Sequence, residues 1–143
     1  LNQFTLNDFV EELGSNIPTP GGGSVSALCG SLGAGLASMV AALTHEKKEF
    51  IDDKPKMNML GEEAQELKDR LLWLVDEDTK AFNNIMASNR LPKSNLQEKR
   101  VKTKAVLKSN MYAIQIPWEV AELSFQMMKL FYLVYYCFQF LQL

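Results

Sequence analysis

The feature that most constrains this chain is a turn that leads directly into a helix, Pro18 to Ser24, with the sequence PTPGGGS. The prolines restrict the backbone, whereas the glycines permit positive φ angles, which we expect at Gly22, and allow a neighbouring segment to approach closely. Ser24 or Ser26 can then cap a helix over residues 25–43, whose first amide groups face the turn. Such a helix start serves either as a rigid entry or as a binding site for an anionic or carbonyl group.

Almost the whole chain has helical periodicity, and strand signals are nearly absent. Thr5 and Asp8 form a capping box for a first helix that begins near Leu6 and ends at Gly14. Further helices are predicted over residues 25–43, over residues 56–88, after a cap formed by Ser94 with Gln97, and at Pro117, which opens or kinks the last one. We therefore expect an all-α antiparallel helical bundle that forms a single domain over residues 1–143.

The helix after the turn carries small residues at three- and four-residue spacing. They are Ala27, Gly30, Ser31, Ala34, Gly35, Ser38 and Ala41. A face of small side chains lets a second helix approach closely. That second helix belongs either to the same chain or to a symmetric partner, and we expect a homo-oligomer, in its simplest form a dimer, with this face and the aromatic tail after Ser124 in or near the contact.

Composition excludes several classes of function. A formal net charge of −2 over 143 residues argues against general nucleic-acid binding. Cys29 and Cys137 lack the spacing of a metal or redox motif, and His45 has no Cys/His cluster near it, so we expect no metal site. The N-terminus is acidic and amphipathic, and the apolar tail is interrupted by Lys129 and glutamines, so we expect a cytoplasmic protein that does not enter a membrane.

One stretch of the chain is strongly basic. Seven basic residues and a single acid, Glu98, lie between Arg90 and Lys108. On a helix they form a cationic face, which is either solvated or able to collect the tail of a polyanionic ligand.

The acidic segment Asp76-Glu77-Asp78 is the clearest candidate for chemistry. The apolar stripe through Leu71 and Leu74 reaches Asp78 at its next step, and a carboxylate on a buried stripe is costly unless it is paired or takes part in acid–base chemistry. Asp76 lies on a different face, near Lys80, and could instead be a solvated member of an ion pair.

Several segments together resemble the C-terminal family of formiminotransferase-cyclodeaminase, whose members are formimidoyltetrahydrofolate cyclodeaminases and methenyltetrahydrofolate cyclohydrolases. The resemblance runs from Gln3 to Ser124. It is carried by the PTPGGGSVSA segment from Pro18, Thr44 with Lys47 and Lys48, LVDEDTKAF from Leu74, RLPK from Arg90 and IPWEVA from Ile116.

The resemblance implies an all-helical subunit that dimerises and binds a folate beside the glycine turn. It assigns substrate binding to Pro20, Gly21, Gly22, Gly23, Ser24, Lys47 and Lys48, and catalysis to Asp78 or Asp76. Of these two, Asp78 is favoured because it lies on the apolar stripe, and no cofactor is expected. The implied reaction converts 5-formiminotetrahydrofolate to 5,10-methenyltetrahydrofolate with release of ammonia. The alternatives are methenyltetrahydrofolate cyclohydrolase, or a catalytically incomplete folate-binding or assembly module, because the chain after residue 124 is atypical of the family.

Overall fold

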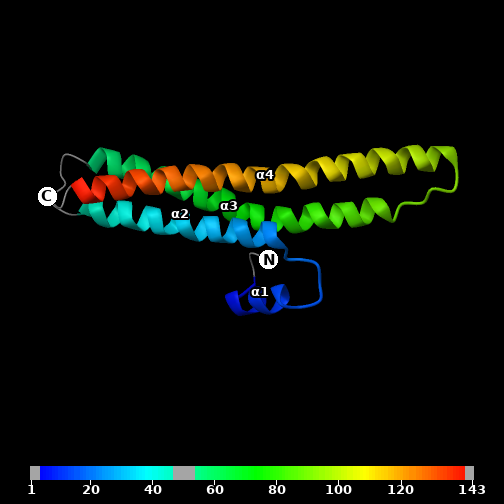
Figure 1. Cartoon of the computed structure of the whole chain (residues 1–143), viewed down its shortest axis with the longest axis horizontal. Helices are drawn as coiled ribbons and strands as arrows, with labels where there is room; N and C mark the ends of the chain where they lie inside the picture. Colours follow the sequence, from blue (N-terminus) through cyan, green and yellow to red (C-terminus); the bar gives the residue numbers. More distant parts are fainter. Residues whose placement is uncertain (1–3, 47–53, 141–143) are drawn as a thin grey trace. The chain divides into compact units, whose positions relative to one another are not determined.

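The computed structural model describes residues 4–46 and 54–140, and within them the chain is all-α, as predicted. Within these two ranges four helices follow one another: α1 (Leu6–Leu13), α2 (Gly22–Glu46), α3 (Lys54–Asn89) and α4 (Leu96–Phe140) (Figure 1). The described residues include no strand. The chain divides into two compact units, one made of Leu1–Ser26 with Trp73–Val120 and the other of Ala27–Leu72 with Ala121–Leu143. The expectation of a single domain stays a prediction.

Local capping signals decide where α1 begins. The Thr5 side chain accepts a hydrogen bond from the Asp8 amide at 3.2 Å, and the Thr5 amide donates to Asp8 Oδ2 at 3.0 Å. This reciprocal pair confirms the predicted capping box. Gly14 ends the helix, also as predicted.

The predicted caps of the later helices are wrong in their details. Ser24 and Ser26 lie inside α2, which begins at Gly22 and whose Val25 amide donates to the Gly21 carbonyl oxygen at 3.1 Å. Among the described glycines none has a positive φ, because Gly22 and Gly23 already have helical backbone. The predictions of a serine N-cap and of positive φ are therefore both wrong.

The start and course of α4 also differ from the prediction. Asn95 replaces Ser94 as the cap, since its Oδ1 accepts from the Glu98 amide at 2.8 Å, while Glu98 accepts from the Ser94 amide at 2.7 Å. Pro117 does not open a new helix, because α4 continues on both sides of it. The fourth and last predicted helices are thus one helix.

The unit formed by Ala27–Leu72 and Ala121–Leu143 has an apolar core from three helices. The core comprises Ala34 and Ala37 of α2, Met57, Leu60, Ala64 and Leu67 of α3, and Leu130 and Val134 of α4. In this unit the three helices run alongside one another (Figure 1). The aromatic tail is therefore an integral part of a helical core up to Val134.

The small-residue face of α2 packs within its own chain. Ala34, Ala37 and Ala41 are fully buried, and the hydroxyl of Ser31 donates to the Lys68 carbonyl oxygen at 2.9 Å. A methyl group at Gly30 would lie 3.1 Å from Leu71 Cδ1. These contacts correct the expectation that this face meets a partner subunit, because α3 and α4 already occupy it.

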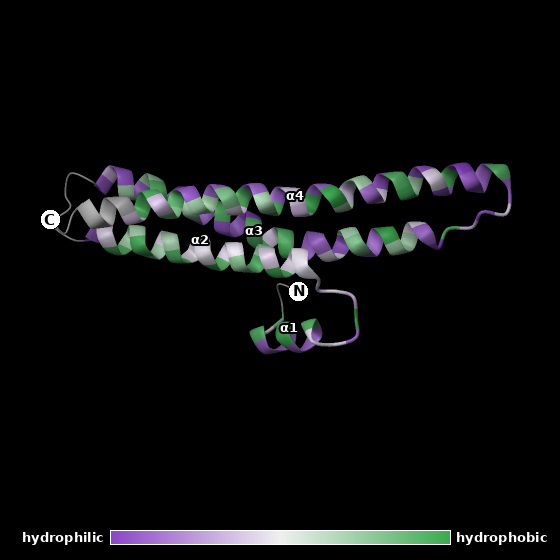
Figure 2. Cartoon of the chain, in the orientation of Figure 1, coloured by the Kyte–Doolittle hydropathy of each residue, from purple (hydrophilic) through white to green (hydrophobic). Residues whose placement is uncertain are grey.

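The composition of α2 is unusually apolar for its length (Figure 2). By length and hydropathy it is the one helix in the described ranges that could cross a membrane, with a mean hydropathy of 1.6 over its most apolar window. A core helix of a soluble protein has the same length and composition. The expectation that the protein does not enter a membrane stays a prediction.

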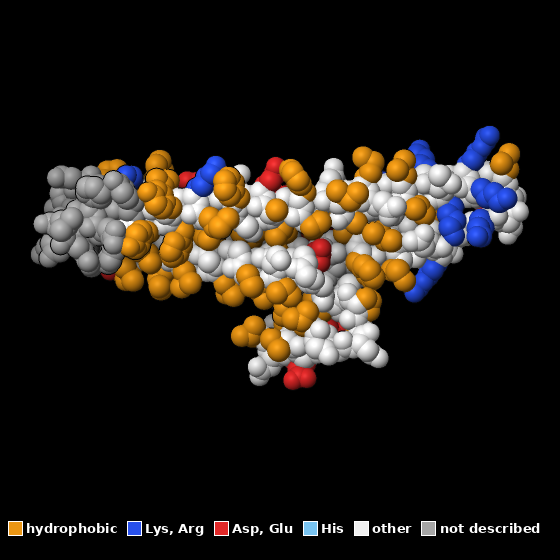
Figure 3. Space-filling view, viewed as in Figure 1, with side chains coloured by type: hydrophobic (Ala, Val, Ile, Leu, Met, Phe, Trp, Pro, Cys, Tyr) orange, Lys and Arg blue, Asp and Glu red, His pale blue; other side chains and the backbone are white. Residues whose placement is uncertain are grey.

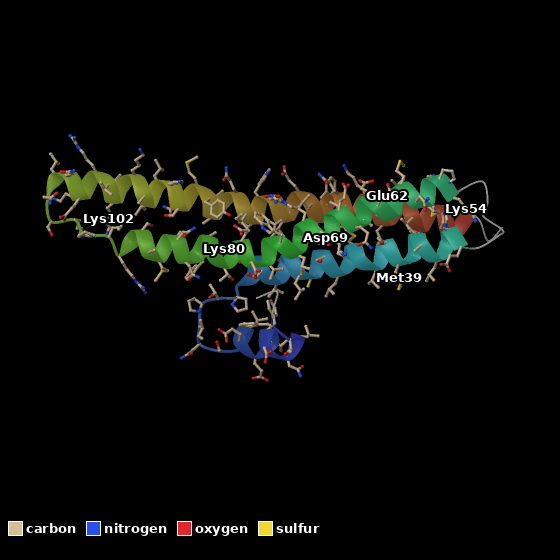
Figure 4. All side chains as sticks on the ribbon, turned by 180° about the vertical axis from the view of Figure 1, so that it is seen from behind. Met39, Lys54, Glu62, Asp69, Lys80 and Lys102 are labelled. Carbon is tan, nitrogen blue, oxygen red and sulfur yellow. The ribbon has the colours of Figure 1, made fainter. Side chains whose placement is uncertain are left out.

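The unit formed by Leu1–Ser26 and Trp73–Val120 joins α1 and the glycine turn to one half of the α3–α4 pair. The hydroxyl groups of Ser88 and Ser109 are 2.8 Å apart and link α3 to α4. Lys102, labelled in Figure 4, donates to the carbonyl oxygens of Asn89 at 2.6 Å and Leu91 at 3.0 Å. A cation at these carbonyls is favourable, because the last turn of a helix leaves its acceptors unpaired.

Candidate functional site

The first turn of α2 and the middle of α3 meet at Ser24 and Asp78. The Ser24 amide donates to Asp78 Oδ2 at 2.9 Å. The Ser24 hydroxyl is fully buried and lies 3.0 Å from both the Val75 carbonyl oxygen and Asp78 Oδ2, so its single proton serves one acceptor at a time. Asp78 therefore caps the N-terminus of α2 from another helix, and neither of its hydrogen bonds uses Oδ1.

Gly23 lies directly against the same carboxyl group. A Cβ atom at Gly23 would lie 2.1 Å from Asp78 Oδ1 and 2.5 Å from its carboxyl carbon, which no real structure tolerates. A Cβ atom at Gly22 would have no neighbour within 4 Å, and one at Gly21 would make only ordinary contacts. The glycine requirement at this turn comes from a close approach at Gly23, and not from backbone conformation.

The turn and the carboxyl group line a common hollow of about 220 Å³. Pro18, Thr19 and the three glycines form one wall, and Asp78, Ala81, Phe82, Ile85 and Ala113 form the rest. The hollow thus combines one carboxylate with the glycine backbone on one side and apolar side chains of α3 and α4 on the other. Such a lining accepts a flat ring, and the carboxylate supplies a proton acceptor or donor.

The structure brings together only some of the sequence-predicted site residues. Gly21, Gly22, Gly23 and Asp78 line the hollow, and Ser24 holds Asp78. Pro20 is buried but does not line it, and Asp76 is partly buried and also does not line it. Lys47 and Lys48 lie outside the described residues. The catalytic and binding roles of all these residues stay predictions.

Sequence reasoning passed over Glu77, which is the most buried carboxylate among the described residues. It is 6% exposed, forms an ion pair with Lys80 Nζ at 2.5 Å, and accepts a hydrogen bond from the Tyr112 hydroxyl. Two hydrogen bonds lower the pKa of Glu77 below its usual 4.5: the bond from Lys80 has the larger effect and the bond from Tyr112 the next largest. The available signal was Lys80 three residues after Glu77, since residues so spaced on a helix are neighbours.

The close approach at Gly23 leads to a prediction about stability. Gly23→Ala is expected to lower the free energy of unfolding by about 1–3 kcal/mol, because the new methyl group must displace Asp78 and break its bonds to Ser24. Gly22→Ala is the matched control and should leave that free energy unchanged or raise it by up to about 1 kcal/mol. Urea unfolding of both variants measures the difference, and equal effects would show that Gly23 is not in contact with Asp78.

The Glu77 network leads to a prediction about pH. Because the folded-state pKa of Glu77 is lowered, unfolded Glu77 binds protons at a higher pH than folded Glu77. The resulting stability is present above pH 4.5 and is lost as the pH falls through the folded-state pKa. Tyr112→Phe is expected to cost about 1–3 kcal/mol at neutral pH and to weaken this pH dependence.

The measurement is urea unfolding between about pH 3 and pH 7. Tyr135→Phe, at an exposed tyrosine, removes the same hydroxyl group away from Glu77 and serves as control. If the two variants lose stability equally at every pH, Tyr112 does not stabilise the Glu77 carboxylate.

Comparison with known proteins shows the family that the sequence motifs suggest. Residues 5–137 match the formiminotransferase-cyclodeaminase family, so the match continues past Ser124. Methenyltetrahydrofolate cyclohydrolase of Methylorubrum extorquens is 32% identical over 113 residues, which cover 79% of this chain and 54% of that protein. Formimidoyltransferase-cyclodeaminase of Rattus norvegicus is 35% identical over 118 residues, which cover 82% of this chain and 22% of that protein.

A solved structure shares the fold. The crystal structure of formiminotetrahydrofolate cyclodeaminase from Thermotoga maritima matches with a TM-score of 0.59 and 23% identity, covering 92% of this chain and 76% of that one. The chain spans about half the length of the cyclohydrolase and about a fifth of the rat protein. The chain belongs to the formiminotransferase-cyclodeaminase family.

Proposed function

We propose that this chain catalyses the cyclodeamination of 5-formiminotetrahydrofolate to 5,10-methenyltetrahydrofolate with release of ammonia. Family membership supports the substrate class, since the relatives are cyclodeaminases and a cyclohydrolase of folates. The observation that carries the proposal is the Asp78 carboxyl group, held through Oδ2 by Ser24 at the wall of a small hollow beside the glycine turn.

The chemistry requires one group that moves a proton between two nitrogens. N10 of the folate attacks the formimino carbon on N5, forming a C–N10 bond, and loses its proton to Asp78. The formimino group enters as the protonated amidinium, so its nitrogen already carries two hydrogens and becomes an amine when N10 adds. That amine takes the N10 proton from Asp78 to become an ammonium group, and the C–N bond to it breaks, releasing ammonia. The methenyl bridge left between N5 and N10 is cationic. A carboxyl group serves this sequence as base, as acid and as counter-ion to the product.

The contacts of Asp78 suit that role. Ser24 fixes the carboxyl group through Oδ2, while Oδ1 lies on the side of Gly23, where a side chain is absent. The N-terminal end of α2 places its positive dipole end at the glycine turn, where a carbonyl group of the pterin ring would be stabilised. We propose that Lys47 and Lys48 contribute to folate binding and that the reaction uses no cofactor.

Methenyltetrahydrofolate cyclohydrolase is the second candidate. Its support is the similarity to the cyclohydrolase of Methylorubrum extorquens. The aligned residues cover 54% of that relative but only 22% of the rat protein, so the cyclohydrolase is the more completely matched of the two. In that reaction the Asp78 carboxylate would orient a water molecule onto the bridging carbon. Purified protein mixed with each substrate separates the two, since cyclodeamination generates the methenyl chromophore and ammonia and hydrolysis consumes the chromophore.

The acid–base role of Asp78 leads to a prediction about turnover. Asp78→Asn is expected to lower kcat by at least about a hundredfold, because the amide cannot exchange protons. Its stability should change little, since an asparagine oxygen still accepts the Ser24 hydrogen bond. Asp76→Asn makes the same chemical change two residues away, outside the hollow, and should keep most of the activity.

The opposite ranking of the two variants would move the catalytic role to Asp76. A protein that binds tetrahydrofolate but turns over neither substrate would instead favour a catalytically incomplete binding module. A protein that neither binds nor converts any folate would contradict the proposed function altogether.

The outer face of α2 leads us to propose a homo-oligomer, most simply a dimer, as the working form. Leu32, Leu36, Met39 and Leu43 are all exposed and follow the four–three–four spacing of a helix-pairing seam. Leu36→Glu is therefore expected to shift the protein to monomer in light scattering at low micromolar concentration. Leu96→Glu, the same change at an exposed leucine of α4, should not, and a wild-type monomer would contradict the proposal.

A further inference from the structure

A second and larger hollow lies between α3 and α4, within the unit that holds the Asp78 hollow. It has a volume of about 990 Å³ and shares no lining residue with the smaller one. Glu77 and Asp78 are consecutive on α3, so their side chains leave the helix about 100° apart and reach different hollows. The larger hollow is therefore not an extension of the proposed cyclodeaminase site.

The lining of the larger hollow is apolar with a cationic edge. Leu91, Leu107 and Met111 supply apolar surface, and Leu107 and Met111 are more than half exposed to solvent. Lys104 and Lys108 are four residues apart on α4 and so share one side of that helix. Figure 3 shows basic side chains gathered toward the end of this unit where α3 and α4 are joined.

The one carboxylate in this lining is already engaged. Glu77 is buried and is bonded to both Lys80 and Tyr112. Lys80 extends from α3 (Figure 4), and its ammonium group lies on the Glu77 carboxylate. Because the charges of Glu77 and Lys80 offset each other, Lys104 and Lys108 give the hollow a net positive charge.

We propose that this hollow binds a small organic anion with a flat apolar body. The body lies on Leu107 and Met111, and the acidic group lies between Lys104 and Lys108. An apolar pocket with a few converging charges is the usual form of a small-molecule site. The two lysines select for negative charge, and the Glu77 carboxylate in the same lining disfavours a second acidic group beside it.

The test is a titration of the ¹⁵N-labelled protein with naphthalene-1-sulfonate, followed by amide chemical shifts. We expect saturable shifts at residues 77–91 and 104–115, which flank the hollow. The double variant Lys104→Ala/Lys108→Ala should weaken binding roughly tenfold, as expected for the loss of two partly screened charge contacts. Lys93→Ala/Arg100→Ala removes the same charge from exposed positions outside the lining and should not weaken it.

Two further arms make the outcome decisive. Naphthalene-1-sulfonamide, which is neutral, should bind at least about tenfold more weakly than the sulfonate if the lysines select for charge. Asp78→Asn should leave sulfonate binding unchanged, so failure of the cyclodeaminase proposal would not affect this result. Equal binding by the Lys104→Ala/Lys108→Ala variant and the Lys93→Ala/Arg100→Ala control, or shifts concentrated on the exposed apolar face of α2, would overturn the proposal.

Discussion

The contact between Gly23 and the Asp78 carboxyl group is the constraint on which the rest of the candidate site depends. A single hydrogen atom on the Gly23 Cα is all that fits there, and this allows the first turn of α2 to lie against α3. Once in place, the Ser24 amide and hydroxyl bond the same carboxyl group. The glycine turn, the helix start and the acid are therefore one structural unit, and the hollow follows from their contact.

This arrangement joins stability and chemistry at one side chain. Asp78 caps the N-terminus of α2 through Oδ2, and the same bonds fix the position of the carboxyl group at the wall of the hollow. The neighbouring Glu77 does not line this hollow; it is buried and bonded to Lys80 of α3 and Tyr112 of α4. Two consecutive carboxylates thus have different surroundings because successive residues of a helix face different neighbours.

Sequence reasoning succeeded where the signal was local. The capping box of Thr5 and Asp8 forms within one turn, so the residue types alone decide it. It failed where a residue distant in the sequence determines the contact. Ser24 is a residue type typical of N-caps, yet its hydroxyl group bonds residues more than fifty positions away. The glycine run led us to expect both a positive φ and a close approach by a neighbour. Only the close approach is found, at Gly23, and the sequence could not show that the neighbour is Asp78.

Burial of the acidic segment was only partly predictable. The apolar stripe pointed to Asp78 and away from Asp76, and the structure places Asp78 alone of these two at the hollow. The apolar stripe gave no indication of Glu77. Lys80 three residues later was a local signal for it, but the Tyr112 hydroxyl group, which also stabilises that carboxylate, comes from α4. The small-residue face of α2 left two kinds of partner open, and only three-dimensional packing shows that its own chain covers it.

The most direct test of this account is a double-mutant cycle between Gly23→Ala and Asp78→Ala, measured as free energies of unfolding. If the methyl group and the carboxyl group compete for one space, Gly23→Ala will cost little once Asp78 is already alanine. The account then predicts a coupling energy of about 1 kcal/mol or more. Additive effects within about 0.5 kcal/mol would contradict it, because they would show that the two residues do not share that space.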